Sequence, residues 1–333
     1  MRALYETIKA QLARIDFEAI WPGFTPVPFA LVGSDQVYLD GREIPKGDGF
    51  WANTSMEFEG AALATWCVDK PETEDPELLA ANIVHEMFHA FQSTRWAGEG
   101  GDEFALMAYP DDLTAYRIKA AEISFLLNAY TNSDPAALTD FINLRKSRAA
   151  ILGDAIIPEL ISEEGEGTAE YAGLEALKQL SHEKYEKLIN ESHIPMLTDP
   201  EKLFSVRFIS YFTGAFLCLT LKKLGIDFYH SLGDPRPLFE VISGSDTLAE
   251  GFQRHYSNKK AKFDDFLTAP HKVIEKNAKI TGFDPMNMWR LGNQYYCARF
   301  VNLDGEGIPG PVILNLKPGS TSQVVGIVLH LSK

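Results

Sequence analysis

The sequence predicts an α+β protein with a small N-terminal mixed β element, a predominantly helical body and a small C-terminal β element. Three observations predict this order. Short runs typical of strands precede residue 75, long helical patterns follow it, and the last fifty residues return to valine- and isoleucine-rich runs separated by glycine and proline. We expect residues 1–280 to form the main domain, with its helical part at 76–280, and residues 281–333 to form the C-terminal β element.

The N-terminal region opens with an amphipathic helix rather than a secretion signal, because Leu4, Ile8, Leu12 and Ile15 form one apolar stripe interrupted by charges. After it, runs of β-branched and aromatic residues between polar turns predict strands. These strands are expected at residues 29–32, 37–39, 54–58 and 61–68.

Asp-Pro pairs mark the starts of several helices in the body, because aspartate is a good N-cap and proline suits the first helical position. The expected helices span residues 76–96, 114–130, 135–152, 166–190 and 200–224. The C-terminal strands are expected at residues 294–301, 312–316 and 323–331.

The composition excludes some classes of function. The 333 residues carry a net charge of −15 and no Lys/Arg-rich run, which disfavours binding to nucleic acid or to an anionic membrane surface. No apolar run is long enough to span a bilayer. The three cysteines are far apart and imply no disulfide framework, so we expect a cytoplasmic protein.

The motif that carries chemistry is His85-Glu86-Met87-Phe88-His89, an H-E-x-x-H sequence in the middle of the first long helix. Residues four apart share a helix face, so His85 and His89 can bind one metal ion. Glu86 lies beside that face, where its carboxylate can take a proton from an attacking water. Two imidazoles and a carboxylate favour zinc, one ion per chain.

A third protein ligand is needed. Gln92 and Arg95 stand where a metzincin would have glycine and histidine, so that class is excluded. A glutamate on a later helix is the alternative, and Glu163, Glu164 and Glu166 are the candidates.

The segment Glu166-Gly167-Thr168-Ala169-Glu170-Tyr171 resembles the E-G-x-A-x-Y segment of the gluzincin metallopeptidases, the zincin group that includes thermolysin and the aminopeptidase N-like enzymes. The resemblance implies a zincin-like catalytic body in which Glu166 binds zinc. Glu170, one helical turn later, fits a partner that orients a zinc-binding histidine. Glu166 follows His89 by 77 residues, a much longer separation than in those enzymes, so the resemblance implies a divergent relative.

Two further segments resemble the aminopeptidase N-like enzymes. Tyr211-Phe212-Thr213-Gly214-Ala215 is similar to their Y-x-x-G-A segment, which implies that Tyr211 binds the oxyanion and that Gly214 permits close helix approach. Tyr171, Tyr229, His230 and His193 are the alternatives to Tyr211. The run Thr54–Glu57 is faintly similar to a substrate-binding strand, and as an edge strand it could pair with an extended peptide.

These residues predict a zinc-dependent metallohydrolase, acting on a peptide or a small amide, with Glu86 as general base. Two alternatives stay open. The chain could be a catalytically silent zinc-site protein that acts as a regulator or scaffold, or a zinc hydrolase of a non-peptide substrate.

Overall fold

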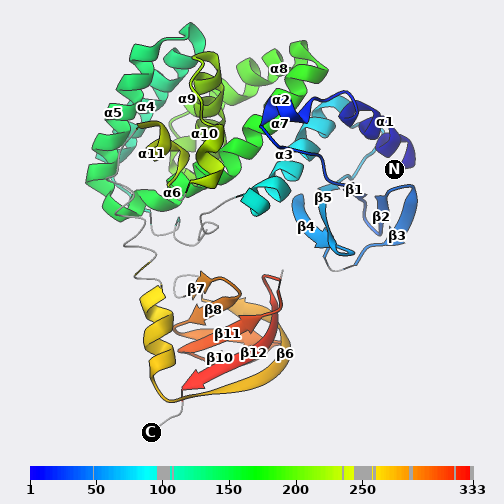
Figure 1. The fold of residues 1–333 in the computed structure, drawn as a ribbon, viewed down its shortest axis with the longest axis vertical. Helices are drawn as coiled ribbons and strands as arrows, with labels where there is room; N and C mark the ends of the chain where they lie inside the picture. Colours follow the sequence, from blue (N-terminus) through cyan, green and yellow to red (C-terminus); the bar gives the residue numbers. More distant parts are fainter. Residues whose placement is uncertain are drawn as a thin grey trace. The chain divides into compact units, whose positions relative to one another are not determined.

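The computed structural model describes residues 1–47, 49–95, 106, 109–234, 236–243, 257, 260–284, 288–318 and 320–330. The chain divides into two compact units. The first comprises residues 1–98, 112–151 and 159–244, and the second comprises 99–111, 152–158 and 245–333. The predicted α+β class is confirmed, because a mainly helical unit is followed by an antiparallel sheet (Figure 1).

The first unit contains a five-stranded mixed sheet in the order β3-β2-β1-β5-β4, in which β1 and β5 are parallel and the other pairs are antiparallel. Helix α3 packs against β5 and β4, and β4 forms one edge of the sheet. The four predicted strands are confirmed, and β3 is an additional one. The strands are β1 Phe29–Val32, β2 Gln36–Leu39, β3 Arg42–Pro45, β4 Thr54–Phe58 and β5 Ala61–Cys67.

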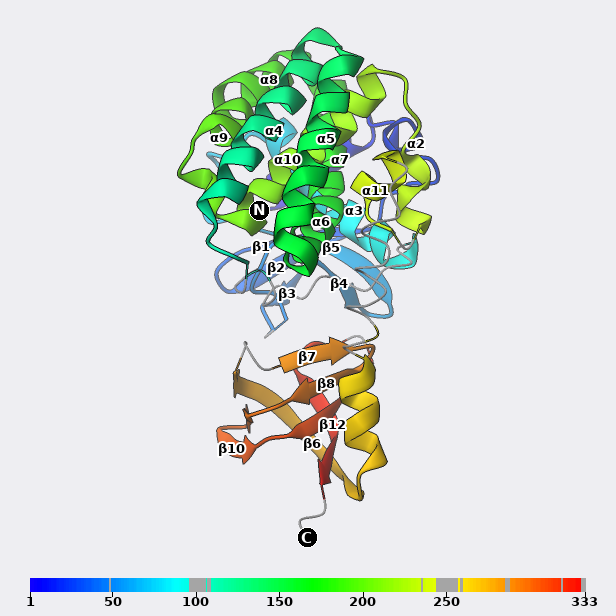
Figure 2. The same ribbon diagram turned by 90° about the vertical axis from the view of Figure 1, so that its left-hand side faces the viewer.

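The remainder of the first unit is helical, and its core joins α3, α7 and α10 (Figure 2). No helix within the described ranges is both long and apolar enough to cross a membrane. The longer helices are α1 Arg2–Leu12, α3 Pro76–Arg95, α4 Leu113–Asn132, α5 Pro135–Leu152, α7 Thr168–Leu180 and α10 Val206–Lys223. The shorter helical segments are α2 Phe17–Ile20, α6 Ile157–Ser162, η3 Glu163–Gly167, α8 His182–Leu188, η4 Ile189–His193, α9 Ile194–Thr198, η5 Lys202–Phe204, η6 Tyr229–Gly233 and α11 Leu238–Ser243. The segment η2 Gly153–Ile156 and the first two residues of α6 belong to the second unit.

Two predicted helices have wrong bounds. The helix expected to begin at residue 166 begins at Ile157 instead. It ends before Ser181, where the backbone is extended and the side-chain oxygen caps the next helix, α8. The helix expected from residue 200 begins at Val206, because the turn capped by Asp199 leaves helical geometry at Ser205. The final residue of the helix expected at 76–96 lies outside the described residues.

The second unit contains a curled seven-stranded antiparallel sheet in the order β10-β9-β6-β12-β11-β8-β7, with helical residues 260–268 packed on one face through Phe263 and Phe266. The predicted boundary at residue 280 is wrong, because it cuts β6, which pairs with β9 and β12 inside this sheet. Strand β6 is largely exposed and contains several lysines and a glutamate, so its sequence lacks the apolar pattern from which a strand is predicted. The strands are β6 His271–Phe283, β7 Met288–Leu291, β8 Gln294–Cys297, β9 Phe300–Leu303, β10 Glu306–Pro309, β11 Val312–Leu316 and β12 Gln323–His330.

Candidate metal centre

Helix α3 presents His85 and His89 on the face that meets α7. The two ring centroids are 4.8 Å apart, as expected for residues one helical turn apart. Gly173 on α7 permits this close approach, because a Cβ there would lie 3.0 Å from the carbonyl oxygen of Ala81 and 3.5 Å from His85 Cβ.

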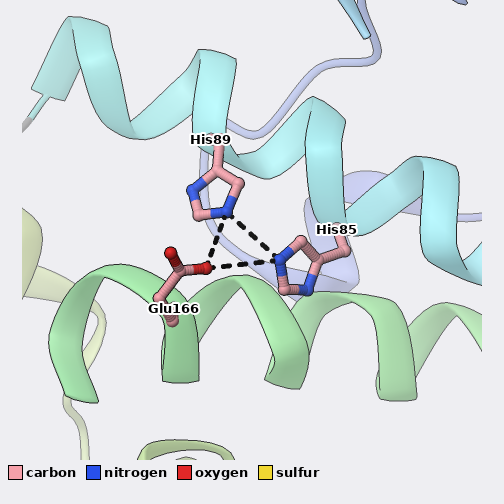
Figure 3. A group of neighbouring side chains, drawn as sticks. All are labelled: His85, His89 and Glu166. Atoms are coloured by element: carbon pink, nitrogen blue, oxygen red, sulfur yellow. Dashed lines mark hydrogen bonds and ion pairs between the residues drawn. The ribbon is translucent and has the colours of Figure 1, made fainter. Parts of the chain in front are cut away.

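The segment η3 supplies the third member of the cluster. It is a π-helical turn between α6 and α7, and it directs Glu166 at the two histidines (Figure 3). Glu166 Oε2 lies 3.2 Å from His89 Nε2 and 3.7 Å from His85 Nε2. The two Nε2 atoms are 3.1 Å apart. Across the described ranges, these three residues are the group whose donor atoms converge in the manner of a metal site.

The spacing of the three atoms fits a tetrahedral metal ion. Zinc bonds nitrogen and oxygen at about 2.0–2.1 Å, so ligand atoms at the corners of a tetrahedron lie about 3.3 Å apart. The observed separations of 3.1, 3.2 and 3.7 Å bracket that value. Two imidazoles and one carboxylate are a donor set that zinc accepts, and an ion held by these three residues would keep a fourth position for water or substrate.

Hydrogen bonds fix the proton of each histidine on Nδ1. His85 Nδ1 donates to Glu170 Oε2 at 3.1 Å. His89 Nδ1 donates to Gln92 Oε1 at 2.7 Å. The amide orientation of Gln92 is set by its Nε2, which donates to the Gly165 carbonyl at 2.7 Å and also to a threonine hydroxyl. Both Nε2 atoms are therefore directed at the same point. When both rings are neutral, their Nε2 lone pairs meet there, an arrangement that a cation stabilises.

The second oxygen of Glu166 is held by Arg207. Its Nη2 donates to Glu166 Oε1 at 2.8 Å, which leaves Oε2 toward the histidines. The hydrogen bonds and charges of the two histidines hold the pKa of Glu166 well below its usual range, although burial alone would raise it. Burial would lower the pKa of His85, but its bonds to Glu166 and Glu170 raise it to about 10 in the metal-free protein.

Glu86 and Tyr211 both lie beside the cluster. Glu86 is buried, and loss of hydration raises its pKa against the opposing charges of His85 and His89. The Tyr211 ring stacks on His85 with centroids 5.9 Å apart and planes 10° apart. Burial, with Glu166 as the next cause, raises the pKa of Tyr211 further above its ordinary value, so its hydroxyl stays a donor.

The other candidate ligands do not join the cluster. Glu163 accepts hydrogen bonds from Arg145 and from Thr213, the latter at 2.6 Å, and belongs to a buried ionic network. Glu164 is buried, and burial raises its pKa well above the usual range. The buried ionic network that contains Glu163 comprises Lys119, Glu122, Arg145, Arg148, Glu159 and Glu163.

Among the alternatives to Tyr211, Tyr171 and Tyr229 bond to each other at 3.4 Å within the aromatic cluster around Trp21. Strand β4 is an edge strand, as a peptide-pairing strand must be.

Comparison with protein-family models, curated proteins and solved structures found no match for this chain.

Two residues of the site, Gln92 and Arg207, have no role in the sequence-based prediction, and a third, His193, appears there only as an alternative oxyanion donor. Gln92 follows His89 by three residues, so its spacing on α3 was a usable signal. Arg207 and His193 lie on separate helical segments, and nothing in the local pattern connects them to the histidines.

Proposed function

We propose that this chain is a zinc-dependent hydrolase of amide bonds, in particular a peptidase and a divergent relative of the gluzincins. The observation that supports it most is the convergence of His85 Nε2, His89 Nε2 and Glu166 Oε2 while the remaining polar atoms of these side chains are held by fixed partners. Such partners are typical of metal sites, because they orient each ligand and tune its basicity.

A zinc ion bound there would make water acidic enough to ionise near neutral pH and would polarise the carbonyl of the scissile bond. The Glu86 carboxylate accepts the proton of the attacking water and later delivers it to the leaving amine. Its raised pKa makes the carboxylate a stronger proton acceptor, which suits the first of these steps. The Tyr211 hydroxyl donates a hydrogen bond to the oxygen on which negative charge develops.

The site is open enough for a substrate. The side chains of Glu166 and His89 keep 18% and 24% of their surface exposed. A cavity of about 450 Å³ adjoins the cluster and is lined by Glu170, Ser205, Arg207, Phe208, Tyr211 and Phe212.

Elemental analysis of the purified protein tests the metal centre, and we expect close to one zinc per chain. His89→Ala should abolish zinc binding, whereas His182→Ala, which removes an exposed histidine of α8, should not. Full zinc occupancy in the His89 variant would contradict the ligand assignment.

Digestion of a peptide library with and without chelator tests the reaction, and Glu86→Gln tests its mechanism. That variant should keep its zinc and lose nearly all hydrolysis, because an amide oxygen does not accept the proton. Glu77→Gln, on the first turn of the same helix, is the matched control. Wild-type hydrolysis by the Glu86 variant would remove Glu86 as base. A zinc-loaded wild type that cleaves no peptide would favour the regulator or scaffold, or a non-peptide substrate.

A further inference from the structure

Glu170 is held from both sides. Its Oε2 accepts the hydrogen bond from His85, and its Oε1 accepts one from His193 Nε2 at 2.8 Å. A carboxylate with one partner can rotate about its side-chain bonds, whereas two partners on opposite oxygens fix its plane. The orientation of the His85 ring therefore depends on a residue 108 positions away in the sequence.

Among the described residues, the hydrogen-bond partner of His193 is Glu170. The ring is 5% exposed and lies edge-to-face with Phe212, with centroids 4.9 Å apart. Its Nδ1 is buried without a hydrogen-bond partner in the described part of the chain. A buried nitrogen without an acceptor is best left without a proton, which places the ring proton on Nε2, facing Glu170.

The backbone that carries His193 is as unusual as the backbone that carries Glu166. His193 ends the π-helical turn η4, and Glu166 lies in the π-helical turn η3. Such turns are rare in proteins, but those that occur are often found at functional sites, because the extra residue changes where the following side chains point. Both of these turns contribute a side chain to one connected set of hydrogen bonds.

We propose that His193 is a positioning residue of the metal centre, which fixes Glu170 and through it the ring of His85. The inference rests on the proposed function, because it assigns His193 a role at the same site. A histidine that merely fills the core would have no need of the bond to Glu170, and a phenylalanine of similar size would replace it.

The experiment compares zinc affinity in His193→Phe and His193→Gln, measured by competition with a chelator of known affinity. Phenylalanine retains the ring and removes the donor, whereas glutamine offers an N–H at nearly the same reach. Loss of a direct hydrogen-bond partner of a metal ligand weakens metal binding by about 10- to 100-fold, and His193 acts one hydrogen bond further out, through Glu170. We therefore expect a loss at the low end of that range, about tenfold, for His193→Phe and a return to within about threefold of wild type for His193→Gln. His182→Ala is the control for the general loss of a histidine.

A second measurement isolates the route through Glu170. In a Glu170→Ala background, His193→Phe should leave the zinc affinity unchanged, because the group through which it acts is gone. The cobalt-substituted protein should also show an altered visible spectrum for His193→Phe and a near-wild-type spectrum for His193→Gln. Thermal melting of each metal-free variant shows whether it folds, and affinities are measured well below the melting temperature.

The outcomes separate this inference from the proposed function. If wild type binds zinc and His193→Phe binds it equally tightly, the positioning role is overturned and the metal centre stands. If the His193 and Glu170 effects simply add, His193 does not act through Glu170. If glutamine fails to restore the affinity in a folded protein, the hydrogen bond is not the cause. If wild type itself binds no zinc, both the proposed function and this inference fail.

Discussion

Substitution of Gly214 by alanine tests how α10 is placed against η3. A Cβ at position 214 would lie 2.3 Å from the Glu163 carbonyl oxygen and 2.8 Å from Gly167 Cα. Non-bonded heavy atoms prefer about 3.5 Å, so the two segments must separate by about 1 Å. Backbone atoms on η3 form the obstacle, so no side-chain rotation relieves it.

The stability change has two parts. Overpacking of this kind costs about 1–3 kcal/mol, and alanine returns up to about 1 kcal/mol through its higher helix propensity. Because the contact is backbone on backbone, we expect a net loss of about 2 kcal/mol, which lowers the melting temperature by about 4–8 °C for a unit of this size.

The proposed hydrolysis should be affected more than stability. The same displacement moves Tyr211 on α10 away from Glu166 on η3, and a misplacement of about 1 Å can reduce turnover by about 100-fold. Thermal melting and steady-state kinetics on the zinc-loaded protein measure both effects. Gly233→Ala is the control, because a Cβ there meets no atom of the described residues within 4 Å. A Gly214→Ala protein with wild-type melting and wild-type kcat would refute the close-packing argument.

Three further predictions follow from the site. Tyr211→Phe should lower kcat by about 10²–10³ with little change in KM or melting temperature, and a kcat within about threefold of wild type would exclude an oxyanion donor. Gln92→Ala should weaken zinc binding by about 10- to 100-fold in a chelator competition, because His89 Nδ1 loses its acceptor; unchanged affinity would show that the acceptor is dispensable. The pKa of His85 near 10 means that zinc must displace its proton. The apparent zinc affinity should therefore rise about tenfold per pH unit between pH 7 and 9, and a flat profile in a chelator titration would contradict this.

The same pKa shift predicts how the stability of the metal-free protein depends on pH. The pKa of His85 is higher in the folded state than its ordinary value of 6.5. Its contribution to stability is therefore complete below about pH 6.5 and is lost as the pH rises toward about 10. Denaturant unfolding in excess chelator at pH 6 and pH 9 measures this loss, and in His85→Gln the loss should be smaller. Equal pH dependence in the two proteins would place the effect elsewhere.

The sequence by itself determined the local features. The spacing of His85 and His89 places both rings on one face of α3 in any α-helix, whatever packs against it. The Asp-Pro starts of α3 and α5, and the strands β1, β2, β4 and β5, follow from capping and from short-range patterning. The close approach expected at Gly214 is confirmed, because any side chain there would collide with η3.

Tertiary structure decided which distant groups meet that helix face. Three glutamates, Glu163, Glu164 and Glu166, lie within four positions, and only the π-helical turn directs Glu166 at the histidines and Glu163 into the ionic network. Tertiary structure also decided that β6 is a strand. Its lysine-rich sequence has no strand pattern, but its backbone pairs with β9 and β12. Local patterns reflect hydrogen bonds within a few residues, whereas the third candidate ligand and the partners that orient the two histidines come from segments up to 108 residues apart. Their positions depend on how whole helices pack, which no short stretch of sequence encodes.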